Sequence, residues 1–547
     1  MKQQVLFFFF TLMLTGISVS AQTGGGRIAG VVIDNAGEEP LPGATIFIEE
    51  LKKGIVTDGH GEFLLSDVPA ATYTLTVRFI GYHTQTRKLT VGKERGKKII
   101  IRLKAEAKSL DEVVVMGKSE ARKLREQAMP ISVISMNQIQ GTVNNVQDIL
   151  AKTAGITVRA TGGTGSTSRI SVRGLEGKRI GLFIDGNPMN DNSDFIDIND
   201  IPVEMIDRIE IYKGVVPAKF GGSAVGGAVN IVIKEYPPKY LDVNYSYGSF
   251  NTHNASVVSK MNIAPKGIEF GLGGFYTYAD NDYKMKSPFQ EGLTITRDHD
   301  KFKKTVIGGS FKARKWWFDL VEFEPVFIHT YKDIQGIESN IRHAHSHSNA
   351  FIFANKMEKE NFLLDGLDLD WQLGYIYTDY HFADTASHRT HWDGTHYPAV
   401  SEFGGEIGKW ASLLTNEKHQ LQHKLNLNYL VNENHSVNFN SLLKYAHANP
   451  RDGMKDKVIG YRTDFPSNMF SWVAGLNYDY RTSNDKFLNS FNVKYYYYSM
   501  KTRMASVLVK TAEDIDTHKN DFGISNALRY RITPSLMAKA SFGYDVR

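Results

Sequence analysis

The chain has 547 residues, enough for several domains, and its formal net charge of +5 is small for that length. Such a balance does not by itself indicate a nucleic-acid partner. The sequence contains no cysteine, which excludes disulfide bonds, thiolate metal sites and cysteine nucleophiles. Aromatic residues make up 12% of the chain, yet its mean hydropathy is only −0.30. A helical membrane protein would be far more apolar, whereas the alternating strands of a membrane β-barrel average out to a modest value.

Residues 1–21 have the pattern of a secretory signal peptide. Lys2 gives a positive start, an apolar run follows from Val5 to Leu14, and Val19 and Ala21 form a small-residue cleavage site. The alternative is a membrane anchor helix, but the run of about ten residues is half of what a bilayer span needs. No later stretch reaches about 18 uninterrupted apolar residues. We therefore expect an exported protein whose membrane spans, if any, are strands.

Residues 27–103 alternate in short apolar runs separated by turn signals. Residues 57–63, Thr-Asp-Gly-His-Gly-Glu-Phe, predict a glycine-rich hairpin turn, and Tyr73, Leu75 and Val77 alternate after it. The pattern predicts a small β-sandwich. Asp58 and His60 could be imagined as metal ligands, but turn residues that tolerate unusual backbone angles are the simpler interpretation.

Residues 104–129 are charged and predict a flexible linker around one apolar island, residues 111–117. β-Branched residues favour strands, yet this island has no neighbouring strand in the sequence. It could pair with the exposed sheet edge of a partner protein. It could equally be a last strand of the preceding sandwich, and the residues alone leave both interpretations open.

Residues 130–236 predict a mixed α/β unit. Residues 146–150 suggest a short helix, Asp185 and Gly186 a tight turn between strands, and residues 229–233 a closing strand.

From residue 238 to residue 547 the sequence pattern changes to long segments in which apolar and polar residues alternate. Leu241, Val243, Tyr245 and Tyr247 alternate with polar residues, and similar patterns recur near residues 367–377, 425–429, 472–480 and 491–497. Some segments are joined by short turns and others by long polar loops. Strands of about ten residues with an aromatic-rich apolar face predict an antiparallel transmembrane β-barrel. A soluble sandwich would also alternate, but it would not place so many Tyr and Trp near strand ends.

Four blocks of residues 130–236 carry a specific resemblance. In order they are Ser-Val-Arg-Gly at 171–174, Ile-Asp-Gly at 184–186, Ile-Asp-Arg-Ile-Glu-Ile-Tyr-Lys-Gly at 206–214, and Phe-Gly-Gly-Ser-Ala-Val-Gly-Gly-Ala-Val-Asn-Ile at 220–231. Together they resemble the plug signature of TonB-dependent outer-membrane receptors. Residues 27–103 resemble a carboxypeptidase-regulatory-like domain, and the two in this order resemble receptors of the Bacteroidetes type. The predicted fold class is therefore mainly β: signal peptide, small β-sandwich, α/β plug domain, then a partial antiparallel transmembrane β-barrel.

The resemblance implies roles for particular residues. It assigns the island at 111–117 to the TonB box, the strand that the energising partner grips: Asp111, Glu112, Val113, Val114, Val115, Met116 and Gly117. It assigns a plug signature to Arg173, Gly174, Asp185, Gly186, Arg208, Glu210, Gly214, Gly221, Gly222, Gly226, Gly227 and Asn230. Arg173, Arg208 and Glu210 match positions where plug charges pair with barrel charges, and buried charges of this kind need partners. The glycines are more simply explained by packing and turns than by ligand contacts.

The family resemblance also implies a function. It predicts active import of a scarce nutrient across the outer membrane, with the sandwich and the box in the periplasm. The implied partners are TonB with its inner-membrane energising complex, outer-membrane lipid, a small nutrient ligand and a surface lipoprotein; no nucleic acid and no cofactor is expected.

The family barrel has about 22 strands, whereas residues 238–547 hold about 12 to 14 candidate strands of roughly ten residues. The sequence stops at Arg547, inside an apparent strand. An open sheet edge is not viable in lipid. We therefore expect a C-terminally truncated fragment of a longer receptor, unable to transport alone.

The ligand is less well specified by the sequence. Histidines concentrate between residues 329 and 396, and His343, His345 and His347 alternate, so on a strand all three would share one face. Imidazoles placed this way could bind a transition metal or haem iron; a polar extracellular loop or lumen face is the alternative. The leading expectation is import of an iron complex, a siderophore or haem. A glycan importer of the starch-utilisation type is the alternative within transport, because Trp and Tyr can stack on sugars.

Two further classes are disfavoured. A surface adhesion or binding protein without transport would not need a TonB box. An enzyme would need a catalytic motif, and the glycine-rich stretch at 221–227 lacks the following Lys-Ser/Thr of a phosphate loop. We therefore predict that the chain is not an enzyme and that it carries no structural metal.

Overall fold

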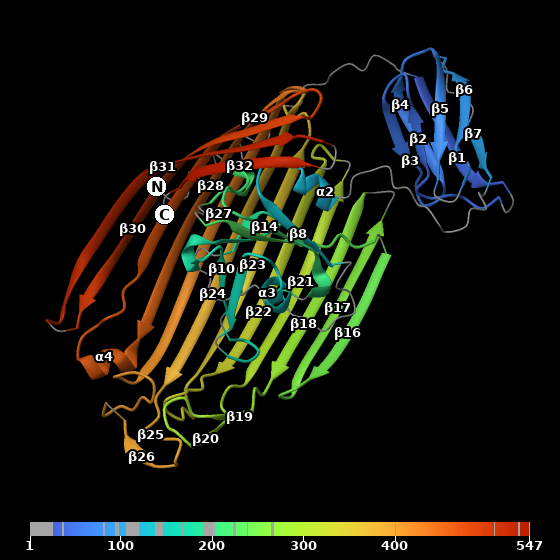
Figure 1. The fold of residues 1–547 in the computed structure, drawn as a ribbon. Coiled ribbons are helices and arrows are strands. Elements are labelled where there is room, and N and C mark those ends of the chain that lie inside the picture. Colours follow the sequence, from blue (N-terminus) through green and yellow to red (C-terminus); the bar gives the residue numbers. More distant parts are fainter. Residues whose placement is uncertain are drawn as a thin grey trace, which may run out of the picture. The chain divides into compact units, whose positions relative to one another are not determined.

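The structure is a computed structural model that divides into two compact units, residues 1–116 and residues 117–547. The first unit holds the predicted sandwich, and the second holds the predicted plug and a large sheet (Figure 1). The structure describes residues 26–35, 38–79, 82–92, 98–104, 120–136, 146–160, 162–166, 168–189, 201, 203–222, 226–237, 239–263, 267–314, 316–399, 401–507, 509–533 and 536–545. The predicted signal peptide and the TonB box lie outside these residues.

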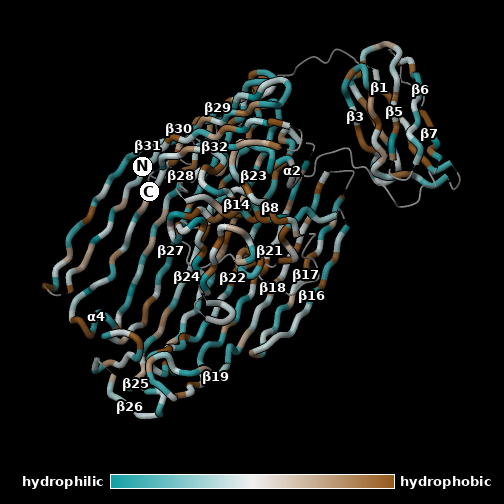
Figure 2. Tube along the Cα trace, viewed as in Figure 1, coloured by the Kyte–Doolittle hydropathy of each residue, from teal (hydrophilic) through white to brown (hydrophobic). Residues whose placement is uncertain are grey.

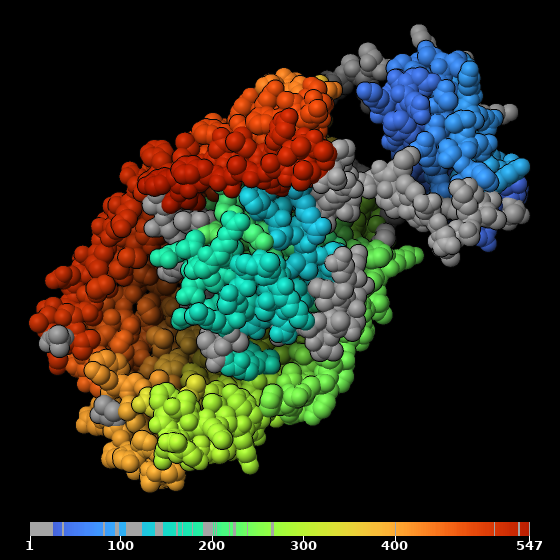
Figure 3. Space-filling view, in the orientation of Figure 1, coloured from blue at the N-terminus to red at the C-terminus, as the bar shows by residue number. Residues whose placement is uncertain are grey.

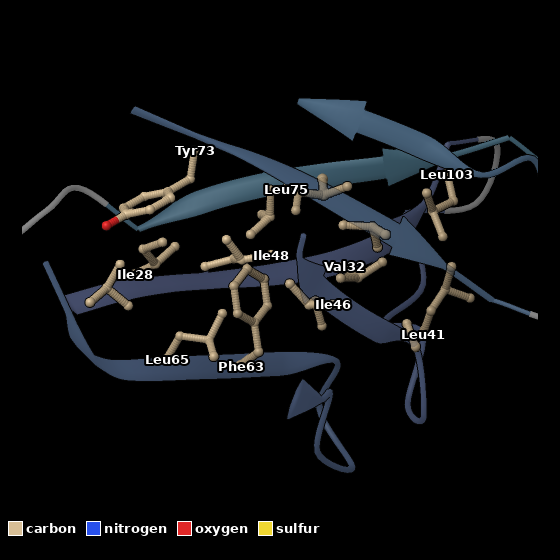
Figure 4. Packing of buried hydrophobic residues seen from close by; sticks show 14 of the residues in the cluster. Ile28, Val32, Leu41, Ile46, Ile48, Phe63, Leu65, Tyr73, Leu75 and Leu103 are labelled. Atoms are coloured by element: carbon tan, nitrogen blue, oxygen red, sulfur yellow. The ribbon is translucent and has the colours of Figure 1, made fainter. Parts of the chain in front are cut away.

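The first unit contains two small sheets around an apolar core. Strand order is β4-β1-β7 in one sheet and β3-β2-β5-β6 in the other. Side chains alternate between buried and exposed along the strands, and the buried ones, such as Ile46, Phe63 and Leu75, meet in one cluster (Figure 4). The strands are β1 (Gly26–Asp34), β2 (Thr45–Ile48), β3 (Lys53–Val56), β4 (Glu62–Val68), β5 (Thr72–Arg78), β6 (Gln85–Thr90) and β7 (Ile99–Leu103).

The glycine-rich turn of this unit is organised by Asp58. One carboxylate oxygen of Asp58 accepts the backbone N–H groups of His60 and Glu62, each at 2.9 Å. Desolvation would raise the pKa of Asp58, but these backbone hydrogen bonds and the charges of His60 and Lys98 lower it. The carboxylate thus completes a turn, as expected for Asp in this position.

The plug part of the second unit is built on a five-stranded sheet with the order β13-β12-β15-β14-β8, beside a three-stranded sheet β11-β10-β9. Ile206, Ile209 and Ile211 of β14 and Val229 and Ile231 of β15 are almost fully buried and form the plug core with the short helix α3. The elements are α2 (Glu120–Arg125), β8 (Ile131–Ser135), α3 (Val146–Ala151), β9 (Ile156–Ala160), β10 (Ser168–Val172), β11 (Leu175–Glu176), η2 (Gly177–Arg179), β12 (Gly181–Ile184), β13 (Asn187–Pro188), η4 (Val203–Met205), β14 (Ile206–Tyr212), η5 (Ala218–Phe220) and β15 (Ala228–Ile233).

The rest of the second unit is one 13-stranded sheet that curls around the plug (Figures 1 and 3). Each strand pairs antiparallel with the next along the chain. The count agrees with the number of strands expected from the alternating segments. The strands are β16 (Lys239–Gly248), β17 (Thr252–Ile263), β18 (Ile268–Ala279), β21 (Phe302–Arg314), β22 (Leu320–Asp333), β23 (His345–Lys359), β24 (Leu367–Asp384), β27 (Ser412–Asn432), β28 (His435–Asp452), β29 (Ser467–Arg481), β30 (Phe487–Ser506), β31 (Thr511–Arg531) and β32 (Met537–Tyr544).

The two ends of this sheet differ in their connections. Short turns, such as residues 433–434 and 482–486, close one end. The long loops lie at the other end, beside the short turn at residues 249–251; they carry two hairpins, β19 (Tyr283–Lys286) with β20 (Thr294–Arg297) and β25 (His388–Thr390) with β26 (His396–Pro398), and the helix α4 (Gly453–Ile459). In outer-membrane barrels the short turns are periplasmic and the long loops extracellular.

The two faces of the sheet differ in chemistry. On β16, the residues Leu241, Val243, Tyr245 and Tyr247 are 67–70% exposed, and they project away from the plug. The intervening residues are polar, and hydropathy alternates along the strands (Figure 2). An outward apolar face and a polar inner face are what a lipid-embedded sheet requires. Within the described residues, no helix has both the length and the apolar character to cross a membrane.

Candidate functional site: the plug and its contacts with the wall

The centre of the plug is a buried carboxylate on β14. Glu210 is 3% exposed and accepts hydrogen bonds from Arg208 Nε at 2.9 Å, Asn230 Nδ2 at 3.0 Å and the Tyr212 hydroxyl at 2.9 Å. A buried charge is stable only when it is paired and hydrogen-bonded, and Glu210 meets both conditions. Burial, followed by the charge of Glu210, raises the pKa of Tyr212, so its hydroxyl remains a donor.

This network continues to the turn between β12 and β13. Asn230 Oδ1 accepts the backbone N–H of Gly186 at 2.9 Å. Asp185 and Gly186 both have positive φ, +48° and +74°, which produces the tight turn that the sequence predicted. The carboxylate of Asp185 accepts the backbone N–H of Ile233 at 3.1 Å. Desolvation by the surrounding atoms raises the pKa of Asp185 to about 6. The residue itself is still exposed to solvent.

Lysines of the sheet hold the plug by its backbone. Lys424 on β27 donates to Gly186 O at 2.8 Å, Lys494 on β30 to Gly222 O at 3.0 Å, and Lys332 on β22 to Gly165 O at 2.8 Å. The 13-stranded sheet, called the wall below, is therefore hydrogen-bonded to three plug turns through their backbone carbonyl oxygens. Such bonds depend on the path of the plug backbone and not on its side-chain charges.

The predicted pairing of plug charges with barrel charges takes a different form. Arg208 contacts Asp207 and Glu210, both in the plug, and Arg173 donates to Lys213 O at 3.3 Å, also in the plug. Arg208 pairs within the plug because β14 places Arg208 and Glu210 on one face of the plug sheet, next to each other. The cations that reach across to the plug come from the wall.

The signature glycines serve turns and close packing. Gly227 has φ +114°, and a Cβ there would lie 2.2 Å from Tyr212 O; a Cβ on Gly226 would lie 2.8 Å from the Leu175 and Ile180 side chains. Only a residue without a side chain fits at these places. Gly174, Gly214, Gly221 and Gly222 also have positive φ in the plug loops.

The strand histidines do not face the plug. Lys332, which touches the plug, is directly paired with Ser346. His345 and His347 flank Ser346 on β23 and therefore project from the opposite, outward face. His347 stacks on His381 of β24, with ring centroids 4.5 Å apart.

Of the three alternating histidines, only His345 and His347 lie on β23; His343 lies outside the strand. It precedes β23, in a connection whose backbone N–H groups are taken up by the carboxylate of Glu406. Nowhere in the described ranges do three His, Asp or Glu side chains group closely enough to hold a metal ion.

The wall lysines were the functional contacts that the sequence did not reveal. Lys424 lies between His423 and Leu425, at a polar position of an alternating segment, and this pattern indicates an inward side chain but not what that side chain contacts. Which inward side chains touch the plug depends on the register of strands far apart in the sequence.

Two parts of the chain match known protein families. Residues 28–115 match the CarboxypepD_reg-like domain, and residues 123–228 match the TonB-dependent receptor plug domain. The chain carries the plug of a TonB-dependent receptor. The structure agrees, since this plug lies within a curled antiparallel sheet.

Curated relatives of the receptor carry the same kind of name. "TonB-dependent receptor P39" from Formosa agariphila is 28% identical over 249 residues, which cover 44% of this chain and 23% of that protein. "Vitamin B12 transporter BtuB" from Vibrio vulnificus is 24% identical over 265 residues, covering 47% of this chain and 43% of that protein. The chain thus spans less than half the length of these two relatives.

Solved structures share the fold of the receptor. The siderophore receptor PiuA from Acinetobacter baumannii superposes with a TM-score of 0.56 at 14% identity, covering 76% of this chain and 64% of that one. These relatives are receptors and transporters, so the prediction that the chain is not an enzyme is confirmed. Receptors of this family are outer-membrane β-barrel proteins, and the outer membrane is the location of this one.

Proposed function

We propose that this receptor takes part in TonB-dependent import of a small anionic nutrient across the outer membrane, and that the nutrient is an iron complex. The proposal rests on the observation that the plug closes the passage inside the curled sheet. The plug fills the curled sheet and is held there by Lys332, Lys424 and Lys494 through backbone carbonyls. Such contacts can be broken and re-formed without rearranging the buried core of the plug.

Closure of this kind requires energy from elsewhere. The outer membrane has no ATP and no ion gradient, so work has to arrive from a partner across the periplasm. The residues 111–117 supply a strand that could add to the edge of a partner sheet, where main-chain hydrogen bonds transmit pull. TonB with its inner-membrane complex is the partner that we propose for the box.

The charge of the inner wall supports an anionic ligand. Lys304 is two residues from Phe302, whose ring lies against Gly165 of the plug, so Lys304 also faces inward. Lys332 is inward by its plug contact, and Lys418 shares the face of Lys424. All three lie towards the long-loop end of their strands. Basic side chains gathered at one end of a passage attract anions.

An iron chelate fits this charge and is the leading candidate, as for the siderophore receptor PiuA, which has the same fold. The outward orientation of His345 and His347 removes them as lumen ligands, so the iron would arrive already chelated. The alternative is an acidic oligosaccharide, which would present the same negative charge together with faces on which Tyr and Trp can stack.

Growth of the native strain on limiting iron tests the proposal. The strain with the intact locus should grow on haem or a ferric siderophore as sole iron source, and a strain with the locus deleted should not. Rescue by the intact gene, but not by a gene carrying Val114→Pro, would support energised import, because Pro removes the N–H that strand pairing needs. Normal growth of the deletion strain on every iron source would overturn the iron assignment. The same comparison on acidic polysaccharides would then decide for the alternative.

A further inference from the structure

Residues 125–129, which follow the box in the sequence, are seated in a socket on the inner wall. Arg531 Nη2 on β31 donates to Glu126 Oε2 at 2.8 Å, and Arg529 Nη1 to Glu126 O at 3.0 Å. Lys539 Nζ on β32 donates to Arg125 O at 2.5 Å and to Met129 O at 3.1 Å. Three basic side chains from the last two strands thus hold this short segment at both ends.

A second carboxylate fixes the two arginines. Asp485, in the turn between β29 and β30, lies 2.6 Å from Arg529 Nη2 and 2.9 Å from Arg531 Nη2. Arg529 is 2% exposed and Glu126 8% exposed. Each arginine is therefore shared between the wall and the plug segment in a site with little water, where losing one partner leaves a buried charge uncompensated.

An apolar contact completes the socket. Ala128 is almost fully buried and packs with Leu488 of β30 and Ala527 of β31. The small side chain allows the segment to lie close to the wall, so that the backbone carbonyls of Arg125 and Met129 come within reach of Lys539.

We infer that residues 125–129 and this socket form a latch that holds the plug seated until the segment is pulled, with Arg529, Arg531 and Lys539 as positioning residues. The inference rests on the proposed function only in naming TonB as the source of the pull. Asp485 marks the short-turn, periplasmic end of the sheet, the end from which such a pull would come. Force applied at residues 111–117 reaches residues 125–129 before it reaches the plug core.

The latch is tested by hydrogen exchange of the full chain in uncharged detergent micelles. Arg531→Gln and Lys539→Gln should each speed exchange in peptides covering residues 120–130 by about tenfold or more, because each removes a charge-assisted hydrogen bond to the segment. Arg531→Lys, which keeps the charge but not the two-pronged geometry, should restore part of the protection. Arg529 is avoided because its deep burial makes misfolding a competing outcome.

Arg481→Gln is the matched control. Arg481, the last residue of β29, lies 3.9 Å from Asp485, and this ion pair does not involve residues 125–129. Its replacement should leave exchange of the segment unchanged. Peptides of β14 and β15 report whether the plug core remains folded in every variant. Native-like exchange of residues 120–130 in both Arg531→Gln and Lys539→Gln, or equal acceleration by Arg481→Gln, would overturn the latch.

A pulling measurement separates the latch from a purely structural role. With a handle near residue 111, the force of the first rupture should fall in Arg531→Gln and stay unchanged in Arg481→Gln. Because exchange and rupture force do not depend on any imported ligand, a failed growth test would leave the latch standing, and a failed exchange test would leave import standing.

Discussion

At the scale of single residues, Asp185 is the titratable group whose environment is most informative. Its pKa is raised to about 6, first by desolvation, from an ordinary value of 3.8. The folded state therefore holds this proton more tightly than the unfolded state does, and the contribution of Asp185 to stability falls as pH rises from about 4 to about 6. We predict that the melting temperature of Asp185→Asn rises relative to that of the native chain between pH 4.5 and pH 7. Asn keeps the acceptor for the Ile233 N–H and tolerates positive φ; a constant difference across this range would contradict the assigned pKa.

Asn230 joins two parts of the plug, since it serves Glu210 with its amide N–H and Gly186 with its amide oxygen. Asn230→Ala leaves a buried carboxylate and a buried backbone N–H each short of one partner. We predict a loss of about 2–4 kcal/mol of protection in the plug strands, measured by hydrogen exchange of peptides from residues 206–233. Asn244→Ala, at an exposed amide on β16, should change protection by less than about 0.5 kcal/mol. Equal effects of the two changes would show that the network does not stabilise the plug.

Residue chemistry could be predicted from the sequence only where local geometry determines it. The Asp185–Gly186 turn was predictable because a two-residue hairpin turn with positive φ at both positions has a strong residue preference. The partner of Arg208 could not be predicted, because it depends on distances between side chains on neighbouring strands, which the sequence does not give. His345 and His347 share a face of β23, but which face that is follows only from the register with Lys332 on β22.

At the scale of elements, the alternation of apolar and polar residues predicted the faces of the strands better than the identity of single residues did. The apolar residues quoted on residues 241–247 all lie on the outward face, as the sequence predicted, since the period of a strand is two. The faces can be tested with two neighbouring residues of β17. Val257 is outward and 42% exposed, whereas Ser256 faces inward, because it pairs with Phe275 on the side that Phe302 shares.

We predict that Val257→Arg destabilises the sheet by about 2–4 kcal/mol in phosphatidylcholine vesicles, because a charge near the bilayer midplane is costly. Ser256→Arg places the same side chain on the polar face and should cost much less. Urea titration of the two variants in the same vesicles provides the measurement. If both variants unfold at the same urea concentration, the assignment of lipid-facing and plug-facing sides is wrong.

At the scale of the whole molecule, the proposed function requires the plug to move relative to the wall. The chain has no cysteine of its own, so an engineered pair can be oxidised without competing thiols. A Cβ built on Gly221 lies 3.1 Å from Leu442 Cβ on β28, close to the separation of Cβ atoms in a disulfide. Gly221→Cys combined with Leu442→Cys should therefore cross-link the plug, directly after η5, to β28 with a shift of a few tenths of an ångström.

We predict that the oxidised double variant, built into the native locus, binds its nutrient but does not import it, and that a reductant restores import. Each single variant is the control, since it carries the same strain at positive φ without the bond. Binding to whole cells and uptake into them are measured separately with a radioactive iron chelate. Uptake at the native rate with the cross-link formed would mean that passage does not need this part of the plug to leave the wall. A loss of uptake that reductant reverses would instead place the moving boundary between the plug and β28, on the side of the plug that Lys424 and Lys494 hold.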